Sequence, residues 1–110
     1  MPTYMIQAAY ANEAWAKLVQ RPENRAEALK VVIERLGGKM LSWYYALGDY
    51  DVVVMMELPS DIAAAAASMA VAAGKAVKAI KTTQLLSPEE GFDALLLAQG
   101  AGYQPPGGQS

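Results

Sequence analysis

The stretch that decides the fold covers residues 37–58 and reads GGKMLSWYYALGDYDVVVMMEL. Two runs rich in aromatic and β-branched residues flank Gly48-Asp49, and such side chains suit the pleated surface of a sheet. Glycine adopts a positive φ without strain, as the first central position of a type II′ hairpin turn requires. The stretch therefore predicts two antiparallel strands joined by a two-residue turn.

This turn also predicts the register of the hairpin. One face then pairs Leu47 with Tyr50, Tyr45 with Val52, Trp43 with Val54 and Leu41 with Met56. Because side chains alternate along a strand, the other face has Met40, Ser42, Tyr44 and Ala46 opposite Asp51, Val53, Met55 and Glu57. Neither face is clearly polar, so the sheet needs a cover on both sides.

Composition excludes several classes of function. The chain has 110 residues, 54% of them hydrophobic, and a net charge of −2, so it has no basic stripe for nucleic acid. It contains no cysteine and no histidine, which excludes disulfides, thiolate or imidazole chemistry and nearly every transition-metal site. Carboxylates do not cluster at ligand spacing, so we expect neither a metal nor a cofactor.

The sequence gives no sign of a membrane or of secretion. Residues 1–4 have no charged region followed by an apolar run, as a signal peptide would have. The longest apolar stretch, residues 62–73, is too short and too rich in alanine to cross a bilayer. We expect a cytoplasmic protein.

The first half of the chain predicts one strand and two helical segments. Residues 3–9 alternate as a strand does, and Asn12 is placed to cap a short helix. Pro22 suits the first position of the next helix, which Gly37-Gly38 ends. Its apolar stripe consists of Ala26, Leu29, Val32, Ile33 and Leu36.

The second half predicts a helix, a strand and a last helix. Ser60 or Asp61 caps the first of these helices, Gly74 ends it, and the residues expected on its inner side are Ile62, Ala65, Ala66, Met69 and Ala73. Residues 75–86 predict a fourth strand. Ser87-Pro88-Glu89-Glu90 starts the last helix, which we expect to dock by Phe92, Leu95, Leu96 and Gln99. Residues 1–99 thus form a single domain, and residues 100–110 a disordered Gly/Pro-rich tail.

The element order β-α-β-β-α-β plus a terminal helix is the ferredoxin-like arrangement, an α+β fold with a four-stranded antiparallel sheet. Both long helices cover one face of such a sheet. The other face is apolar in this chain, so we expect it to meet the sheet of a second copy. Two chains would then form a dimeric α+β barrel, alone or within a larger assembly of dimers.

The residues around the hairpin resemble the GYD-domain family. The matching residues are Gly37-Gly38-Lys39, the run YYALGDYDVV at 44–53, Arg25, and Pro59-Ser60-Asp61. The resemblance covers roughly residues 3–97. It implies a dimeric α+β barrel and leaves the biochemical role undefined. Where members often have Tyr-Trp-Thr, this chain has Tyr44-Tyr45-Ala46. We therefore expect no role in this chain that depends on that Trp or Thr.

The candidate ligand-pocket residues are Tyr10, Trp43, Tyr45, Tyr50 and Asp51. Aromatic residues on strands serve most often as core or interface anchors, but they can also line an apolar pocket. Asp51 has two readings as well: it bonds backbone N–H groups near the turn, which we favour, or it acts as a general base. Arg25 is most simply a solvated helix residue, with anion binding as the lesser alternative.

Two hypotheses on function remain open at this point. The first is a non-enzymatic, homo-oligomeric module that binds a small apolar ligand or assembles with a partner. The second is a cofactor-independent enzyme, similar to a monooxygenase or isomerase, that acts on a small apolar or aromatic substrate in a barrel pocket. We favour the first and assign no catalytic residue, because the chain lacks histidine and cysteine.

Overall fold

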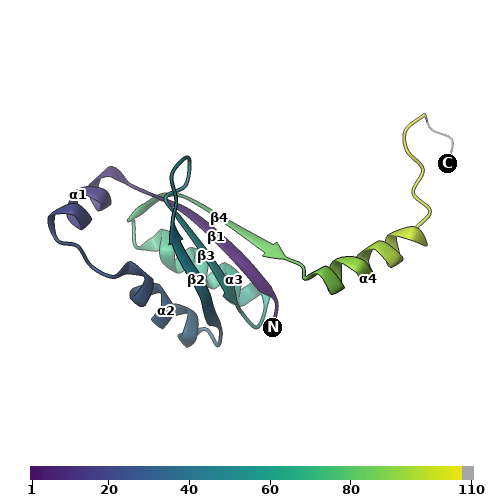
Figure 1. Ribbon diagram of the computed structural model, residues 1–110, viewed down its shortest axis with the longest axis horizontal. Coiled ribbons are helices and arrows are strands. Elements are labelled where there is room, and N and C mark those ends of the chain that lie inside the picture. The colour runs from purple at the N-terminus through teal and green to yellow at the C-terminus, as the bar shows by residue number, and fades with distance from the viewer. Residues whose placement is uncertain (108–110) are drawn as a thin grey trace.

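A single antiparallel sheet organises the computed structural model, which describes residues 1–107 (Figure 1). The strand order is β2-β3-β1-β4. In chain order the elements are β1 (Thr3–Tyr10), α1 (Asn12–Gln20), α2 (Arg25–Arg35), β2 (Lys39–Tyr45), β3 (Val52–Glu57), α3 (Asp61–Ala73), β4 (Val77–Leu85) and α4 (Pro88–Gln99). This is the predicted ferredoxin-like α+β fold with a C-terminal helix.

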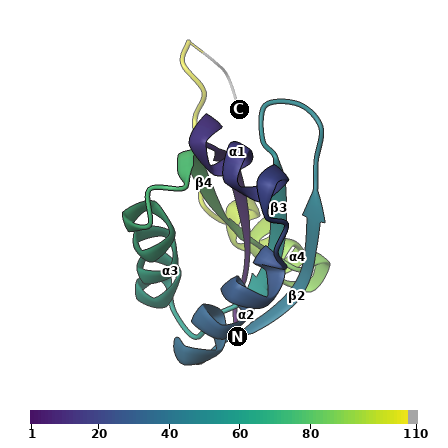
Figure 2. The ribbon, with the colours of Figure 1, turned by 90° about the vertical axis from the view of Figure 1, so that its left-hand side faces the viewer.

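The core lies between the sheet and helices α1, α2 and α3. Alternate residues of β1 and β3 are buried there, among them Ile6, Val54 and Met56. Ile33 of α2 and Ala67 of α3 complete the core from the helix side. Figure 2 shows α2 and α3 beside each other over the sheet.

The other side of the sheet is here called the open face. Strand pairing places on it Met5, Gln7, Ser42, Tyr44, Val53, Met55, Lys81 and Thr83. The core helices lie on the opposite side, and α4 extends away from the sheet (Figure 1). Tyr44 is 65% exposed. The open face is therefore uncovered within this chain, as the sequence predicted, but it mixes apolar side chains with polar ones such as Gln7 and Lys81.

The hairpin confirms part of the predicted register and corrects the rest. Tyr45 pairs with Val52, and Trp43 with Val54, as expected. Met56, however, pairs with Met40 instead of Leu41, because the register shifts between Met40 and Ser42. This β-bulge moves Met40 to the helix side.

The predicted two-residue turn is wrong, because the paired register ends at Tyr45 and Val52. Asp51 bonds to the neighbouring strand: its amide donates to the Ala8 carbonyl at 2.8 Å. Its carbonyl also accepts a hydrogen bond from the Ala46 amide at 2.8 Å. These bonds join Ala46 to Asp51 and Asp51 to β1, so the loop between them consists of residues 47–50 and is longer than two residues. Gly48 nevertheless has a φ of +124°, so the expected positive φ is confirmed.

The starts of α1 and α2 differ from prediction. Asn12 is the first residue of α1 and does not cap it. For α2 the cap is Asn24, whose side chain accepts a hydrogen bond from the Glu27 amide, so the helix begins at Arg25 and not at Pro22. A helix with Pro22 at its first position would have Arg21 as its cap, whereas the Asn24 side chain satisfies an otherwise unpaired helix N–H.

The inner side predicted for α3 is wrong. Ala64 and Ala67 are buried, whereas Ile62 is 82% and Met69 is 70% exposed. Two side-chain contacts fix this rotation. The Tyr4 hydroxyl donates to Asp61 Oδ1 at 2.6 Å, and the hydroxyls of Ser68 and Thr82 are hydrogen-bonded at 2.6 Å.

The ends of α3 agree more closely with prediction. Ser60 caps the helix by accepting a hydrogen bond from the Ala63 amide at 3.2 Å, as one of the two predicted caps. Lys75, one residue beyond Gly74, carries the positive φ of +64° at the other end.

Helix α4 does not dock on its own domain. Ser87 and Glu90 form the predicted capping box. The apolar side chains predicted to dock are exposed to solvent: Phe92 is 60%, Leu95 is 70% and Leu96 is 53% exposed. Figure 1 shows α4 running outward from the end of β4. Its stripe is thus a second uncovered apolar surface.

The segment after α4 has neither helix nor strand over residues 101–107 and is exposed. The rest of the predicted tail, residues 108–110, lies outside the described residues, and its disorder stays a prediction. None of the helices in residues 1–107 has the length and apolar character needed to span a membrane.

Candidate functional site

A cavity of about 240 Å³ lies between the helix side of the sheet and helices α2 and α3. Residues of all four strands contribute to its lining, including Ile6 and Val54. Leu29 lines it from α2, and Val71 lines it from α3. Most of the lining is aliphatic, so the cavity favours an apolar occupant.

Small residues leave this space unfilled. Ala28 of α2 faces the same cavity as Ala70 and Gly74 at the end of α3, with Ala76 just before β4. None of these has a side chain larger than a methyl group, so the gap between the two helices is not closed. Ala28, Ala70 and Gly74 are also exposed to solvent, which makes this side of the cavity its mouth.

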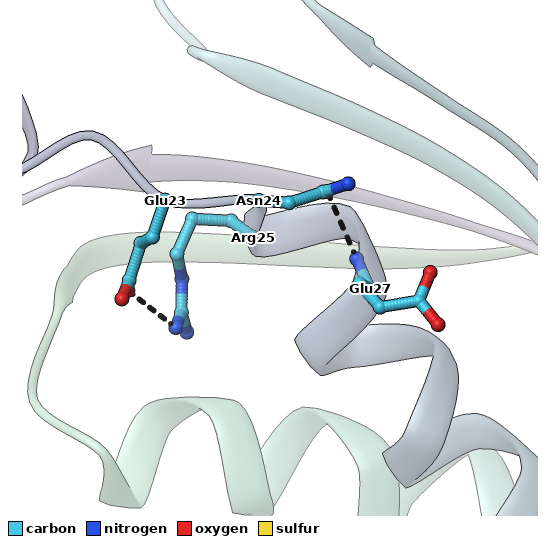
Figure 3. Close-up of polar contacts among 4 residues, drawn as sticks. All are labelled: Glu23, Asn24, Arg25 and Glu27. Carbon is cyan, nitrogen blue, oxygen red and sulfur yellow. Dashed lines mark hydrogen bonds and ion pairs between the residues drawn. The ribbon is translucent and has the colours of Figure 1, made fainter.

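Among residues 1–107, Arg25 is the one residue of the cavity lining that has a charged side chain. It is the first residue of α2, placed there by the Asn24 cap. Its Nη1 donates to Glu23 Oε1 at 3.0 Å, with the two side chains 37% and 59% exposed. Figure 3 shows the Glu23 and Arg25 side chains on the same side of the turn that precedes α2.

Tyr10 brings a phenol to the same cavity. The residue is only 5% exposed, and its ring packs edge-on against Trp15 with centroids 5.1 Å apart. Burial raises the pKa of the Tyr10 hydroxyl, as does the neighbouring Tyr45, while the charge of Arg25 opposes this shift. Hydrogen bonding to the Arg25 side chain also lowers this pKa, so the two polar groups of the cavity lie side by side.

The sequence profile of the GYD domain matches residues 4–95. The chain belongs to the GYD domain family. Among curated proteins, none matches this GYD domain significantly.

A solved structure confirms the fold of the GYD domain. MtbAldR, known from a crystal structure, is similar with a TM-score of 0.55 and 15% sequence identity, over 78% of this chain and 52% of that one. The chain therefore spans about half the length of MtbAldR, and the likeness concerns the fold alone. Protein Atu4242 from Agrobacterium tumefaciens has a TM-score of 0.47 and 13% identity, over 78% of this chain and 92% of that one.

The five predicted pocket residues of the GYD domain fall into two groups. Tyr10 and Trp43 line the cavity. Tyr45 does not, but it packs against Trp43 with ring centroids 6.2 Å apart and against Trp15 at 6.4 Å. Tyr50 and Asp51 lie in the hairpin loop, outside the lining. Their roles in ligand binding stay predictions.

Asp51 makes the kind of backbone bond that we favoured for it. Its Oδ2 accepts a hydrogen bond from the Tyr10 amide at 2.8 Å, which ties the hairpin loop to the end of β1. This bond also holds the backbone of a cavity residue. The carboxylate therefore acts on the cavity indirectly, through the position of Tyr10.

Sequence reasoning missed the cavity itself. Arg25 was considered for anion binding, but nothing indicated that it lies beside Tyr10. Ala70 and Val71 are part of an alanine-rich helix whose inner side was assigned wrongly. Groups of acidic residues able to hold a metal ion are absent from the described part of the chain.

Proposed function

We propose that this GYD domain is a non-enzymatic module that binds a small, largely apolar molecule in the cavity beneath α2 and α3, and that it works as a homo-oligomer. The observation that carries the proposal is the cavity: aliphatic side chains line most of it, and Arg25 and Tyr10 add polar groups. Apolar walls with a few polar groups that orient the ligand are the usual anatomy of a small-molecule site.

The chemistry of the lining favours binding over catalysis. The chain has no histidine or cysteine, the side chains most often used as general base or nucleophile. Asp51, the candidate base of the enzyme hypothesis, is outside the lining and accepts a hydrogen bond from the backbone of Tyr10. An arginine and a tyrosine suffice to orient a ligand.

The open face supports association of two copies. Tyr44, Val53 and Met55 lie on it, and the core helices of the same chain cover only the opposite side of the sheet. A second sheet placed against this face would bury these side chains and give a dimeric α+β barrel. Apolar sheet faces are stable in water when another layer covers them.

A pair of variants on α3 tests the binding site. Ala70 lines the cavity mouth, whereas Ala72 is exposed, does not line the cavity and lies roughly 200° around the helix axis. The probe is 3-phenylpropanamide, a neutral apolar molecule, titrated by calorimetry. We expect Ala70→Phe to weaken its binding at least about tenfold by filling the mouth, and Ala72→Phe to leave binding unchanged.

Both variants are first compared with the wild type by thermal unfolding, so that a loss of binding is not a loss of folding. Equal affinities of the two variants would contradict the proposed site. Absence of binding of both this amide and its carboxylate analogue, 3-phenylpropanoate, to the wild-type protein would contradict the proposed function.

A further inference from the structure

Two hydrogen-bond donors border the otherwise apolar cavity. A guanidinium has five N–H donors, and the structure shows the Arg25 side chain using Nη1 for one bond, to Glu23. The Tyr10 residue is 95% buried, and its hydroxyl lies beside Arg25: burial raises the pKa of this phenol, while the charge and hydrogen bonding of Arg25 lower it. Donors placed in this way suit a ligand with acceptor atoms.

We propose that the ligand carries a carboxylate or a similarly shaped oxyanion at one end, and that Arg25 binds this group in place of Glu23. The proposal rests on the proposed function and specifies its ligand class, a small apolar acid. The apolar part would occupy the cavity between α2 and α3, and the anionic group would lie at Arg25.

Charge complementarity carries this inference. Arg25 is a cation in the lining, and none of the described lining residues is acidic. A guanidinium can bind a carboxylate through two parallel N–H···O bonds, which a single contact to Glu23 Oε1 does not achieve. Because its pKa is raised by burial, the Tyr10 phenol is protonated at neutral pH and can donate a further bond.

Glu23 acts as an internal competitor in this scheme. It precedes Arg25 by two residues, and its side chain is 59% exposed. Exposed ion pairs contribute little free energy, so a ligand can displace Glu23 at small cost. Removing the Glu23 charge should therefore strengthen binding of an anion and leave binding of a neutral molecule unchanged.

The test compares two probes of nearly the same shape, 3-phenylpropanoate and its neutral analogue 3-phenylpropanamide. We expect the wild-type protein to bind the acid about tenfold more tightly than the amide. Arg25→Gln should weaken the acid far more than the amide and so remove this preference. Glu23→Gln should strengthen the acid alone, by about two- to fivefold. Arg35→Gln, at the far end of α2 and outside the lining, is the matched control and should change neither affinity.

The outcomes separate the two proposals. Equal binding of acid and amide by the wild type, or a preference that survives Arg25→Gln, would overturn the anionic ligand and leave the apolar binding site standing. Binding of the amide alone would also overturn the anionic ligand and leave the apolar binding site standing. Failure of both probes to bind would overturn the proposed function and, with it, the inference that rests on it.

Discussion

Tyr4 fixes the position of α3 on the sheet. Its ring is buried in the core, and its hydroxyl donates to Asp61 Oδ1 at the first residue of that helix. The hydrogen bond to Asp61, then burial, and then the charge of Asp61 raise the pKa of Tyr4 from 10.0 to about 12. Together with the Ser68–Thr82 hydrogen bond, this contact selects the side of the alanine-rich helix that meets the core.

The first prediction concerns the pH dependence of this contact. Because the pKa of Tyr4 is higher in the folded state than the ordinary 10.0, its contribution to stability is complete below pH 10 and is lost as the pH rises through about 12. The free energy of unfolding should therefore fall more steeply over this range in the wild type than in Tyr4→Phe. Urea denaturation at several pH values measures both slopes, and equal slopes would contradict the Tyr4–Asp61 bond.

The second prediction concerns Asp51. Asp51→Asn keeps a side-chain oxygen that can accept from the Tyr10 amide, so we expect only a modest loss of stability. Asp51→Ala leaves that amide without its partner and should cost about 1–3 kcal/mol. Chemical denaturation near neutral pH gives both values. A clear gain in stability for Asp51→Asn would mean that the carboxylate is unfavourably buried, and would revive the general-base hypothesis.

At the scale of elements, the connection between α2 and β2 is the tightest point of the chain. A Cβ added at Gly38 would overlap the backbone oxygen of Glu57 and lie 2.6 Å from Leu58 Cδ2. At Gly91, within α4, a Cβ would meet no atom within 4 Å. The two glycines thus form a pair of one crowded and one open position.

The third prediction uses this pair. We expect Gly38→Ala to destabilise the protein by about 2 kcal/mol or more, because the strand end must move to accept the methyl group. Gly91→Ala should leave global unfolding unchanged, because α4 does not pack on the domain, while raising the helix content slightly. Thermal unfolding followed by circular dichroism reports both effects. A Gly38→Ala variant as stable as Gly91→Ala would show that the approach of α2 to β3 is looser than described.

Elements with a clear apolar pattern were predictable from the sequence. Helix α2 has one side far more apolar than the other, and β1 and β3 were predictable as strands, although β3 is apolar on both faces. In α3 the alanines lie on every side, so the pattern could not select Ala64 and Ala67; Tyr4 and Thr82, distant in sequence, do so. The bulge at Leu41 and the long hairpin loop also depend on contacts with other strands.

At the scale of the whole molecule, the cavity could not be predicted from the sequence. Its lining combines residues from all four strands and two helices, and no two of its polar groups share an element. Tyr10 and Trp43 were singled out for being aromatic, and their place in the lining follows from the packing of α2 and α3. Arg25 lies in the cavity lining because α2 is capped by Asn24 and begins at Arg25, and not at Pro22.

The fourth prediction is that the protein is a homodimer or a larger assembly at micromolar concentration, associated through the open face. Met55→Lys places a charge at the centre of that face and should shift sedimentation velocity toward the monomer. Met69→Lys, at a 70% exposed position on the outer side of α3, is the control and should sediment as the wild type. A wild-type protein that sediments as a monomer would contradict the shared barrel.

An NMR titration with 3-phenylpropanamide tests most directly whether the ligand site lies beneath α2 and α3. The amide signals of Ala28, Ala70, Val71 and Val77, all in the cavity lining, should shift with a common affinity. Those of Ser42, Met55 and Thr83 on the open face should shift little. Shifts concentrated on the open-face residues would place the ligand between two sheets, as in a barrel pocket, and would contradict the helix-side cavity as the binding site.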